Sequence, residues 1–492
     1  MNKAIIIGAG IAGIATAIRL TIKGYRVVVF EANSYAGGKL SEIGNAGFRF
    51  DAGPSLFTMP QYIDELFKLA GKDPRAYFNY RKLPLVCKYF YEDGTEINAF
   101  ADPQAFAEEI AAKTSDPAAK VQSFLNKSQE IYDITNHIFL EKSLHRISSF
   151  LSWKVLWSIL RFRRIDPFRT MANANAAWFS DSKTQRFFNR YATYNGSDPY
   201  QAPATLNVIP HLEQHFGAYF PEGGMYAIVR SMLRLAEECG VQFRYDAKVD
   251  EILIKDRKAI GISVNRTLEF ADLIVSNTDV HFTYKHLLKG FKMPAKVEKQ
   301  ERSSSALIFY WGISRQFPAL DLHNIFFSEN YQQEFEAIWK EKTISNDPTV
   351  YVNISSKLRP EDAPEGMENW FVMINVPSNS GQSWDELIAQ SRRAIVAKLS
   401  RILKVDIDPL IVSEEILDPR SIEQRTSSYQ GSLYGTSSNN QFAAFLRHAN
   451  FSSRISRLYF TGGSVHPGGG IPLALLSARI VANLIPNAIP VK

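Results

Sequence analysis

The stretch Gly8-Ala9-Gly10-Ile11-Ala12-Gly13 lies between a short apolar run at residues 4–7 and a longer apolar stretch that continues to about residue 23. The run before the glycines predicts a strand buried on both faces, and the stretch after them predicts a helix. Gly24 stands where a helix commonly ends. Residues 27–30 are β-branched and aromatic, so we expect a second buried strand and therefore an opening βαβ unit.

The spacing of the three glycines favours a nucleotide site. Gly8 permits a tight turn, Gly10 lets the backbone approach a pyrophosphate, and Gly13 lets the helix pack on the strand. The first helical N–H groups, at Ile11 and Ala12, favour bound phosphate. An ordinary glycine-rich turn is the alternative. The flanking strand and helix, together with an acidic residue at the end of the second strand, favour a dinucleotide site.

That acidic residue is Glu31, which follows Gly13 by 18 residues. A carboxylate there accepts hydrogen bonds from ribose hydroxyls and repels a 2′-phosphate, which argues against NADP. We expect Ala32 to contribute to the same contact. The stretches Gly37-Gly38-Lys39 and Gly53-Pro54-Ser55 follow closely. A second glycine pair so soon after the acid suits backbone that lies against an extended cofactor, so FAD is favoured over NAD.

A second glycine-rich stretch lies near the other end of the chain, and it runs Phe460-Thr461-Gly462-Gly463-Ser464-Val465-His466-Pro467-Gly468-Gly469-Gly470-Ile471-Pro472. Its five glycines and two prolines exclude a regular helix or strand, and Pro472 suits the first turn of the helix predicted after it. A surface loop is the alternative. That alternative does not explain why a predicted strand and an apolar helix flank the stretch.

These two glycine-rich stretches resemble the flavin-binding signatures of FAD-dependent bacterial carotenoid desaturases, within the amine oxidase superfamily. The resemblance continues through Tyr191-Ala192-Thr193-Tyr194 and Phe220-Pro221-Glu222-Gly223-Gly224-Met225, and it covers nearly the whole chain. Ser55-Leu56-Phe57-Thr58-Met59-Pro60 looks most like the hydroxycarotenoid 3,4-desaturases, as does Pro203-Ala204-Thr205-Leu206-Asn207. Lys39 stands where the family more often has arginine, and lysine offers a point charge instead of a two-pronged contact.

The resemblance implies an α/β fold with a Rossmann-type FAD-binding domain, a mixed-sheet substrate domain and a helical, membrane-facing region. The FAD-binding domain would comprise residues 1–75, 225–285 and 415–492, the substrate domain 76–104, 201–224 and 286–414, and the helical region 105–200. It further implies that Gly463 lies against the pyrophosphate and ribityl chain. Gly470, Ile471 and Pro472 would lie against the isoalloxazine ring, and the backbone of Val249 would meet the adenine.

The implied reaction introduces a C–C double bond into an acyclic or hydroxylated carotenoid, with 3,4-desaturation favoured. A hydride would pass to flavin N5 and a proton would leave the neighbouring carbon. His466 is a weak catalytic candidate, because an equally good role is to fix the turn by hydrogen bonding. Within the family, a phytoene desaturase or a carotenoid isomerase is the alternative, and a non-redox FAD-stabilised scaffold is another.

A flavin amine oxidase is the remaining alternative. Such an enzyme would require an aromatic cage beside the flavin and often has a covalent cysteine–flavin bond. No Cys, Phe, Tyr or Trp occurs between Thr461 and Arg479.

Metal and disulfide chemistry are not expected. His211 and His215 are four residues apart, but their context does not match His-Glu-x-x-His and no third ligand is evident. Cys87 and Cys239 form neither a disulfide framework nor a zinc motif, which indicates a reducing compartment. The net charge of +6 suits an anionic membrane or cofactor better than a nucleic acid.

Residues 149–164 combine aromatic and basic side chains at helical spacing, which suits the headgroup region of an anionic membrane. The predicted contacts are Trp153, Trp157, Arg161, Arg163 and Arg164. A core helix with a solvated tail is the alternative. The apolar stretch at 4–18 is too short to span a bilayer, and we expect no targeting signal.

We therefore expect a cytoplasmic protein that is associated peripherally with the membrane. Its partners would be a lipophilic carotenoid, which the 33 Phe and 21 Tyr could surround, and an electron acceptor such as quinone or oxygen.

Overall fold

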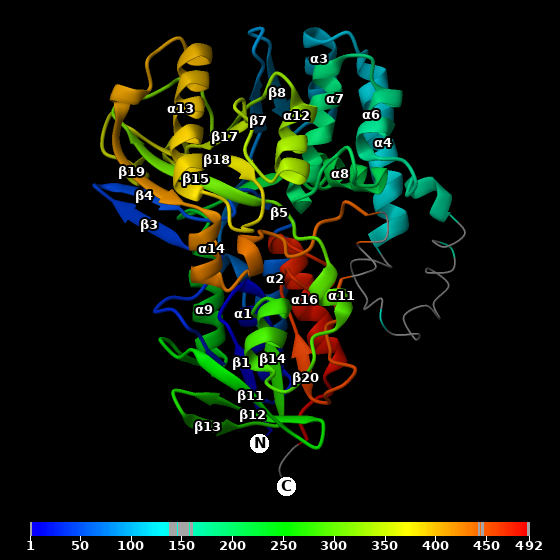
Figure 1. Ribbon diagram of the computed structural model, residues 1–492, viewed down its shortest axis with the longest axis vertical. Coiled ribbons are helices and arrows are strands. Elements are labelled where there is room, and N and C mark those ends of the chain that lie inside the picture. Colours follow the sequence, from blue (N-terminus) through cyan, green and yellow to red (C-terminus); the bar gives the residue numbers. More distant parts are fainter. Residues whose placement is uncertain are drawn as a thin grey trace.

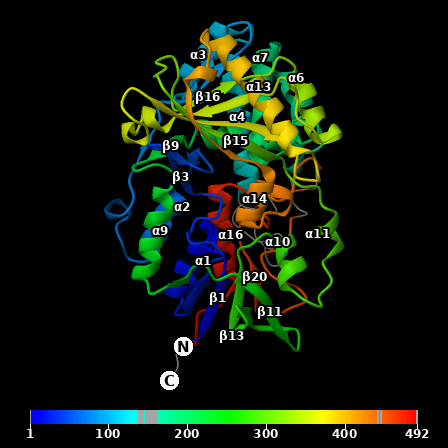
Figure 2. The same ribbon diagram turned by 60° about the vertical axis from the view of Figure 1, so that its left-hand side comes forward.

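The computed structural model describes residues 2–136, 145, 157, 161–440, 443 and 447–489. The protein has two lobes, which lie one above the other in Figures 1 and 2. A five-stranded sheet forms the centre of the lower lobe, and a seven-stranded sheet forms the centre of the upper lobe. Both chain ends lie at the far tip of the lower lobe.

The lower sheet is parallel throughout, and its strand order is β10-β2-β1-β14-β20. Its strands are β1 (Lys3–Ile7), β2 (Arg26–Phe30), β10 (Gln242–Arg244), β14 (Leu273–Ser276) and β20 (Leu458–Phe460). The sheet therefore assembles from three distant parts of the chain. Helix α1 (Ile11–Ile22) joins β1 to β2, so the predicted βαβ unit is confirmed.

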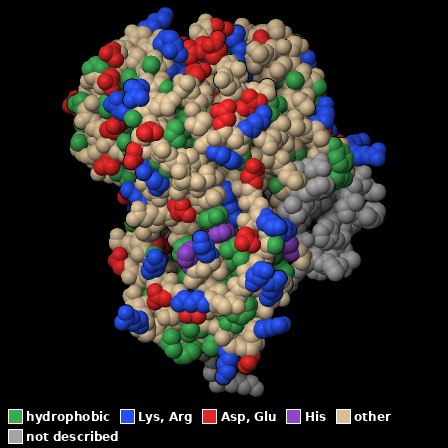
Figure 3. Space-filling model, viewed as in Figure 1, with side chains coloured by type: hydrophobic (Ala, Val, Ile, Leu, Met, Phe, Trp, Pro, Cys, Tyr) green, Lys and Arg blue, Asp and Glu red, His purple; other side chains and the backbone are tan. Residues whose placement is uncertain are grey.

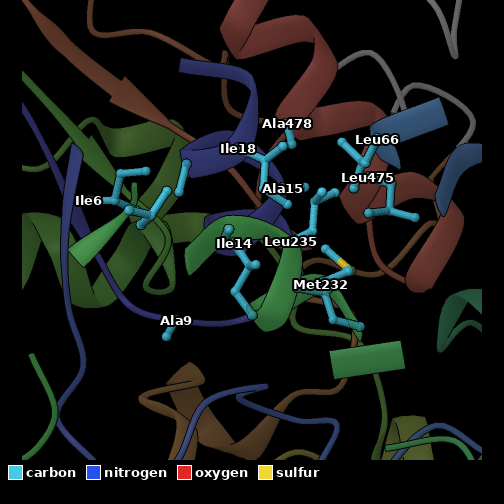
Figure 4. Close-up of a cluster of buried hydrophobic side chains, with 14 of the residues drawn as sticks. Ile6, Ala9, Ile14, Ala15, Ile18, Leu66, Met232, Leu235, Leu475 and Ala478 are labelled. Atoms are coloured by element: carbon cyan, nitrogen blue, oxygen red, sulfur yellow. The ribbon is translucent and has the colours of Figure 1, made fainter. Parts of the chain in front are cut away.

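Helix α1 is apolar on every side because other elements surround it. It packs against α9 (Ala227–Glu238), α16 (Ile471–Leu484) and α2 (Gln61–Leu69). Figure 4 shows how side chains of α1 and these neighbours meet in one apolar cluster. The labelled side chains include Ile14, Ile18, Met232, Leu235, Leu475 and Ala478, and all are fully or almost fully buried.

The opposite face of the parallel sheet is covered by a three-stranded antiparallel sheet. This sheet consists of β11 (Val249–Lys255), β12 (Lys258–Val264) and β13 (Thr267–Phe270). Ile5 and Val28 point to this side, whereas Ile6 and Val29 point to the helices. The alternation explains why residues 4–7 of β1 and 27–30 of β2 are all apolar, although each strand begins with a basic residue.

The upper sheet has the order β19-β15-β18-β17-β16-β7-β8, and only the β16–β7 pair is parallel. Its strands are β7 (Leu85–Phe90), β8 (Glu96–Phe100), β15 (Ser305–Ile313), β16 (His323–Phe326), β17 (Val350–Asn353), β18 (Glu368–Val376) and β19 (Ile411–Leu417). Helix α13 (Trp384–Leu403) packs on one face through Trp384, Ile395 and Leu399. Together with the parallel sheet of the lower lobe, this mixed sheet confirms the predicted α/β fold, and the membrane-facing region stays a prediction.

Smaller elements complete both lobes. The upper lobe carries α3 (Pro103–Lys113), α4 (Ala118–Thr135), α6 (Met171–Trp178), α7 (Ser182–Asn189), α8 (Ile209–Gln214) and α12 (Tyr331–Glu336). The other short strands are β3 (Glu42–Asn45), β4 (Phe48–Asp51), β5 (Phe57–Thr58), β6 (Tyr80–Lys82) and β9 (Ala218–Pro221). The other short helices are α10 (Val280–Phe282), α11 (Ala295–Lys299) and α14 (Pro419–Thr426).

The predicted domain boundaries differ in detail from the lobes. Strand β19 crosses the boundary predicted at residue 415, and its last residues pair with β15 in the upper sheet. The stretch 105–200 is largely helical where the structure describes it. None of the described helices is both long and apolar enough to cross a bilayer. On the upper lobe, acidic and basic side chains are interspersed over the face that Figure 3 shows.

Candidate functional site

A cavity of about 680 Å³ begins at the carboxyl edge of the parallel sheet and continues into the upper lobe. The residues that follow β1, β2 and β14 line its lower part, and residues of β16, β17 and β18 line its upper part. Ligands of open parallel sheets bind at this edge. The cavity is therefore the candidate site.

The first glycine-rich turn forms one wall. Gly8 has a φ of 98°, which glycine adopts without strain. Helix α1 begins at Ile11, with Gly10 as the N-cap residue and no capping side chain. Gly10, Ile11 and Ala12 line the cavity. The free N–H groups of this first turn thus face a space suited to phosphate.

Gly13 has a different position from the other predicted cofactor residues. It is not among the residues that line the cavity, and its role as a cofactor contact stays a prediction. A Cβ atom at this position would lie 2.2 Å from the Gly8 carbonyl oxygen. The absence of a side chain lets α1 pack closely on the turn, which is the packing role that the sequence also predicted for this glycine.

Asn277, directly after β14, holds the two glycine-rich stretches together. A Cβ atom on Gly10 would lie 2.7 Å from the Oδ1 atom of Asn277. On its other side, Nδ2 donates a hydrogen bond to the Thr461 carbonyl at 3.0 Å. A Cβ on Gly462 would lie 2.8 Å from that Nδ2 atom. Both stretches therefore need glycine because the same amide packs between them.

Glu31 lies at the carboxyl end of β2 and is buried. One carboxylate oxygen accepts a hydrogen bond from the Ala9 N–H at 2.7 Å. The other accepts from the backbone and side-chain nitrogens of Asn33, both at 2.9 Å. A carboxylate has about four acceptor positions, so Glu31 still has capacity for a ribose hydroxyl. Glu31 and Ala32 both line the cavity.

Lys39 lines the cavity, but its ammonium group is already hydrogen bonded. Its Nζ donates to the backbone carbonyls of Ser432 at 3.0 Å and Leu433 at 2.6 Å. One of its three donor hydrogens remains for a cofactor phosphate. Burial lowers the pKa of Lys39 to about 8, and the Asp279 carboxylate partly opposes that effect.

The second glycine-rich stretch forms the facing wall. Helix α16 begins at Ile471, with Gly470 as the N-cap residue, no capping side chain and a proline in the first turn. Gly470 has a φ of 100°, which glycine adopts without strain. This second uncapped helix start also faces the cavity. A negative charge on a ligand would be stabilised there.

The cavity brings together the remaining residues that the sequence predicted. Its walls include Gly8, Gly10, Ile11, Ala12, Glu31, Ala32, Gly38, Lys39, Gly53, Pro54, Ser55, Val249, Gly463, Gly470, Ile471 and Pro472. Sequence reasoning missed Asn277, Thr278 and Asp279, which line the same cavity. They directly follow a buried parallel strand, and residues in that position commonly contact ligands, so their place in the sequence could have indicated them.

These observations test whether the walls fit FAD. Two helix starts present free N–H groups, and an acid at the end of β2 faces the same space. The backbone approaches very closely at Gly53, where a Cβ would lie 1.9 Å from the Lys39 carbonyl oxygen. Such a wall is made of backbone with few side chains, as an extended dinucleotide requires. The residues fit FAD.

His466 is buried and lines the cavity. Its backbone N–H donates to the His448 carbonyl at 3.0 Å, and its backbone carbonyl accepts from Asn450 Nδ2 at 2.8 Å. The centre of its ring lies 6.0 Å from that of His145. The geometry is compatible with both predicted roles, contact with a ligand and fixing of the turn.

His211 and His215 stack with their ring centres 4.5 Å apart. Burial and the neighbouring His215 lower the pKa of His211 to about 4. Within the described part of the chain, no three His, Cys, Asp or Glu side chains lie together in a way that could hold a metal ion.

The comparison with known proteins agrees with this site. The family described as flavin containing amine oxidoreductase matches residues 11–486. The chain belongs to this family. FAD is therefore its cofactor, as the two glycine-rich stretches predicted.

The relatives include carotenoid enzymes. The chain is 51% identical to the 1-hydroxycarotenoid 3,4-desaturase of Flavobacterium sp. (strain P99-3), with 99% of each chain covered. It is 34% identical to the 4,4′-diapolycopene oxygenase of Methylomonas sp., with 98% of each chain covered. The predicted resemblance to carotenoid desaturases is confirmed. An oxidoreductase from Methanosarcina mazei has the same fold, with a TM-score of 0.64 at 17% identity and coverage of 98% and 100%.

The substitution Glu31→Gln should weaken FAD binding about tenfold to a hundredfold, because hydrogen bonds to a charged acceptor become hydrogen bonds to a neutral one. Flavin absorbance after extensive dialysis measures the retained FAD. Glu336→Gln, at a half-buried glutamate of the upper lobe that pairs with Lys340, is the matched control. Equal FAD retention in wild type and Glu31→Gln would contradict the assignment of Glu31.

FAD affinity should fall as pH rises above about 8. Lys39 is charged below its pKa of about 8 and neutral above it. The cofactor phosphates favour the charged form and so raise this pKa, which means that binding takes up a proton at higher pH. The dissociation constant should rise by up to tenfold per pH unit there.

Fluorescence titration between pH 6.5 and 9.5 measures this dependence. Lys39→Met should remove most of the slope, and Lys39→Arg should flatten it while it keeps the charge. An unchanged slope in Lys39→Met would show that another group titrates.

Proposed function

We propose that the protein introduces a C–C double bond into an acyclic, hydroxylated carotenoid, with the 3,4 bond as the favoured position. The observation that carries this proposal is the continuity of the FAD cavity with an apolar chamber of the upper lobe. Names of two relatives, a 1-hydroxycarotenoid desaturase and a diapolycopene oxygenase, support the substrate class.

The chamber suits a long hydrocarbon. Its aliphatic wall residues are Val86, Ile165, Leu206, Val208, Ile209, Leu212, Ile325 and Met373. Tyr132, Phe162 and Phe371 add aromatic surface. A polyene offers almost no polar group for recognition, so its binding free energy must come from removal of apolar surface from water, at about 25 cal/mol per Å².

The acids of the cavity argue against an amine substrate. Among the described residues that line the cavity, the only carboxylates are Glu31 and Asp279. Both lie at the carboxyl edge of the parallel sheet, where the cofactor residues are. The chamber in the upper lobe thus offers no carboxylate from its described residues to a substrate ammonium group. This distribution favours a neutral substrate over the amine oxidase alternative.

The cavity walls explain how the reaction could be controlled. Bound FAD supplies the acceptor for a hydride from the carbon chain. The apolar walls orient one C–C bond and exclude water, which would otherwise add to the electron-poor carbon and give an alcohol. The conjugated system spreads the positive charge, and loss of a proton from the adjacent carbon completes the double bond. The substrate thus loses one hydride and one proton.

Purified holoprotein incubated with a 1-hydroxylated acyclic carotenoid should give a product two mass units lighter that absorbs at longer wavelength. Mass spectrometry and absorption spectra measure both changes. A product of unchanged mass would identify an isomerase, and conversion of a colourless polyene would identify a phytoene desaturase. Oxidation of simple amines without a change in the carotenoid would overturn the proposal in favour of an amine oxidase.

We further propose that the protein takes this substrate from the cytoplasmic face of a membrane and passes electrons to a quinone or to oxygen. Phe162, Ile165 and Pro167 line the cavity, and the neighbouring Phe168 is 70% exposed. Arg161 stacks over the Trp157 ring at 4.0 Å.

The basic residues Arg163 and Arg164 are exposed beside this aromatic group. Aromatic and basic side chains so close to a cavity wall suit an anionic lipid surface. Trp153, which completes the predicted motif, lies outside the described residues.

Phe168→Ser combined with Arg163→Glu should lower binding to anionic liposomes by at least about tenfold, through lost apolar and electrostatic contacts. Sedimentation with the liposomes measures the bound fraction. Phe270→Ser, at an exposed phenylalanine of β13, is the matched control because it removes the same side chain from the other lobe. If the double variant sediments as the wild type does, this surface is not the membrane contact.

A further inference from the structure

The chamber has a polar edge beside the cofactor residues that desaturation of a plain hydrocarbon would not need. Ser55 Oγ and the Tyr351 hydroxyl are hydrogen bonded at 2.7 Å, and the same hydroxyl is 2.7 Å from His323 Nδ1. Ser55 and Tyr351 are partly exposed and line the cavity. The contact joins a loop next to the cofactor residues to strands β16 and β17 of the upper sheet. This chain of three polar groups is therefore built into the substrate side of the site.

The side-chain amide of Asn353 determines which group donates and which accepts in these hydrogen bonds. Asn353 Nδ2 donates to the Leu322 carbonyl at 3.0 Å, which fixes the orientation of the amide. The same nitrogen lies 3.2 Å from His323 Nδ1, so Nδ1 must be the acceptor and the ring proton is on Nε2.

Tyr351 therefore donates its proton to His323 Nδ1. Because a hydroxyl has one proton, the Tyr351 oxygen then accepts the Ser55 proton. Ser55 Oγ and the Tyr351 oxygen keep lone pairs but have no further proton to donate. The edge can accept a hydrogen bond from a ligand.

The edge is also neutral. Burial, with a smaller contribution from the Arg190 charge, lowers the pKa of His323 to about 3. Burial raises the pKa of Tyr351 above its ordinary value. The Arg190 guanidinium is itself held by the Tyr194 hydroxyl at 2.9 Å and by Glu213 at 3.7 Å. Arg190 also lines the cavity, and the Glu213 carboxylate balances its charge. The Ser55 and Tyr351 oxygens are thus neutral acceptors, which match an alcohol.

We propose that Ser55 and Tyr351 form the subsite that accepts the hydrogen bond of the substrate hydroxyl, and that His323 positions Tyr351 for this role. The inference rests on the proposed function. In a 1-hydroxylated carotenoid, three bonds separate the oxygen from carbon 3, which places them about 4 Å apart. The group that holds the hydroxyl must therefore lie close to the reacting bond. Ser55 meets this requirement, because it directly follows Gly53 and Pro54 on the cofactor side of the cavity.

The experiment compares two substrates on the holoprotein in lipid vesicles. One is a 1-hydroxylated acyclic carotenoid, and the other has the same polyene without the hydroxyl. The wild type should prefer the hydroxylated substrate in kcat/KM. Tyr351→Phe keeps the ring and removes the oxygen, so it should reduce that preference about tenfold. The loss should be in KM for the hydroxylated substrate only, and Ser55→Ala should act in the same direction.

Tyr91→Phe is the matched control. It removes a buried hydroxyl that donates to the Lys183 carbonyl in the upper lobe, away from the described cavity walls. It should leave the preference unchanged. An equal fall of kcat/KM for both substrates in Tyr351→Phe would indicate a structural role and overturn the subsite.

Two outcomes with the wild type separate the subsite from the function on which it rests. A wild type that desaturates both substrates equally well overturns the subsite and leaves the proposed function intact. A wild type that desaturates neither substrate overturns the proposed function itself.

Discussion

The amide of Asn277 is the contact on which the site depends, because two glycine-rich stretches far apart in the sequence pack against it. Its oxygen occupies the space that a Cβ of Gly10 would need, and its nitrogen holds the carbonyl of Thr461. A side chain on either stretch would separate the walls of the cofactor cavity. Backbone can therefore approach the cofactor from both sides. Both helix starts then face one space, and this arrangement concentrates positive potential where the phosphates and the flavin bind.

Desaturation of a polyene requires few polar or charged side chains in the upper lobe. A polyene carries no charge, and the electron pair that leaves it has its acceptor in the cofactor. The chamber contributes orientation, removal of water and, at Ser55 and Tyr351, one neutral acceptor. A charged group at that edge would bind the reacting chain poorly. The same apolar fold can thus serve relatives that act on different carotenoids, because small changes along its wall would alter which bond is presented.

Much of the lower lobe could be predicted because its signals are local. The run before Gly8, the glycine spacing and the apolar helix after it lie within a few residues of one another, and the structure has the same βαβ unit. The close packing of Gly13 on the Gly8 carbonyl oxygen agrees with the packing role that the glycine spacing predicts. The resemblance to a known family supplied the cofactor and the pairing of the two ends.

The contacts that join distant segments could not be predicted from local patterns. Ser55 and Tyr351 are 296 residues apart in sequence, and Lys39 bonds to carbonyls more than 390 residues away. Nothing in the neighbourhood of Lys39 indicates that its charge is largely used by the backbone of residues 432–433. The composition, rich in Phe and Tyr, also did not indicate which aromatic side chains would form the chamber. Such contacts depend on tertiary packing and on hydrogen-bond direction.

The interleaved order of the parallel sheet has a consequence for biosynthesis. Strand β1 pairs with β2 and with β14 from the middle of the sequence, β14 pairs in turn with β20, and α16 covers α1 only after residues 471–484 have been made. On the ribosome, the apolar surface of α1 stays without this partner while the more than 440 residues between the two helices are made. The cofactor pocket can close only after α16 has left the ribosome. Until then, this apolar surface is open to non-native contacts, which is a cost that the topology imposes on folding.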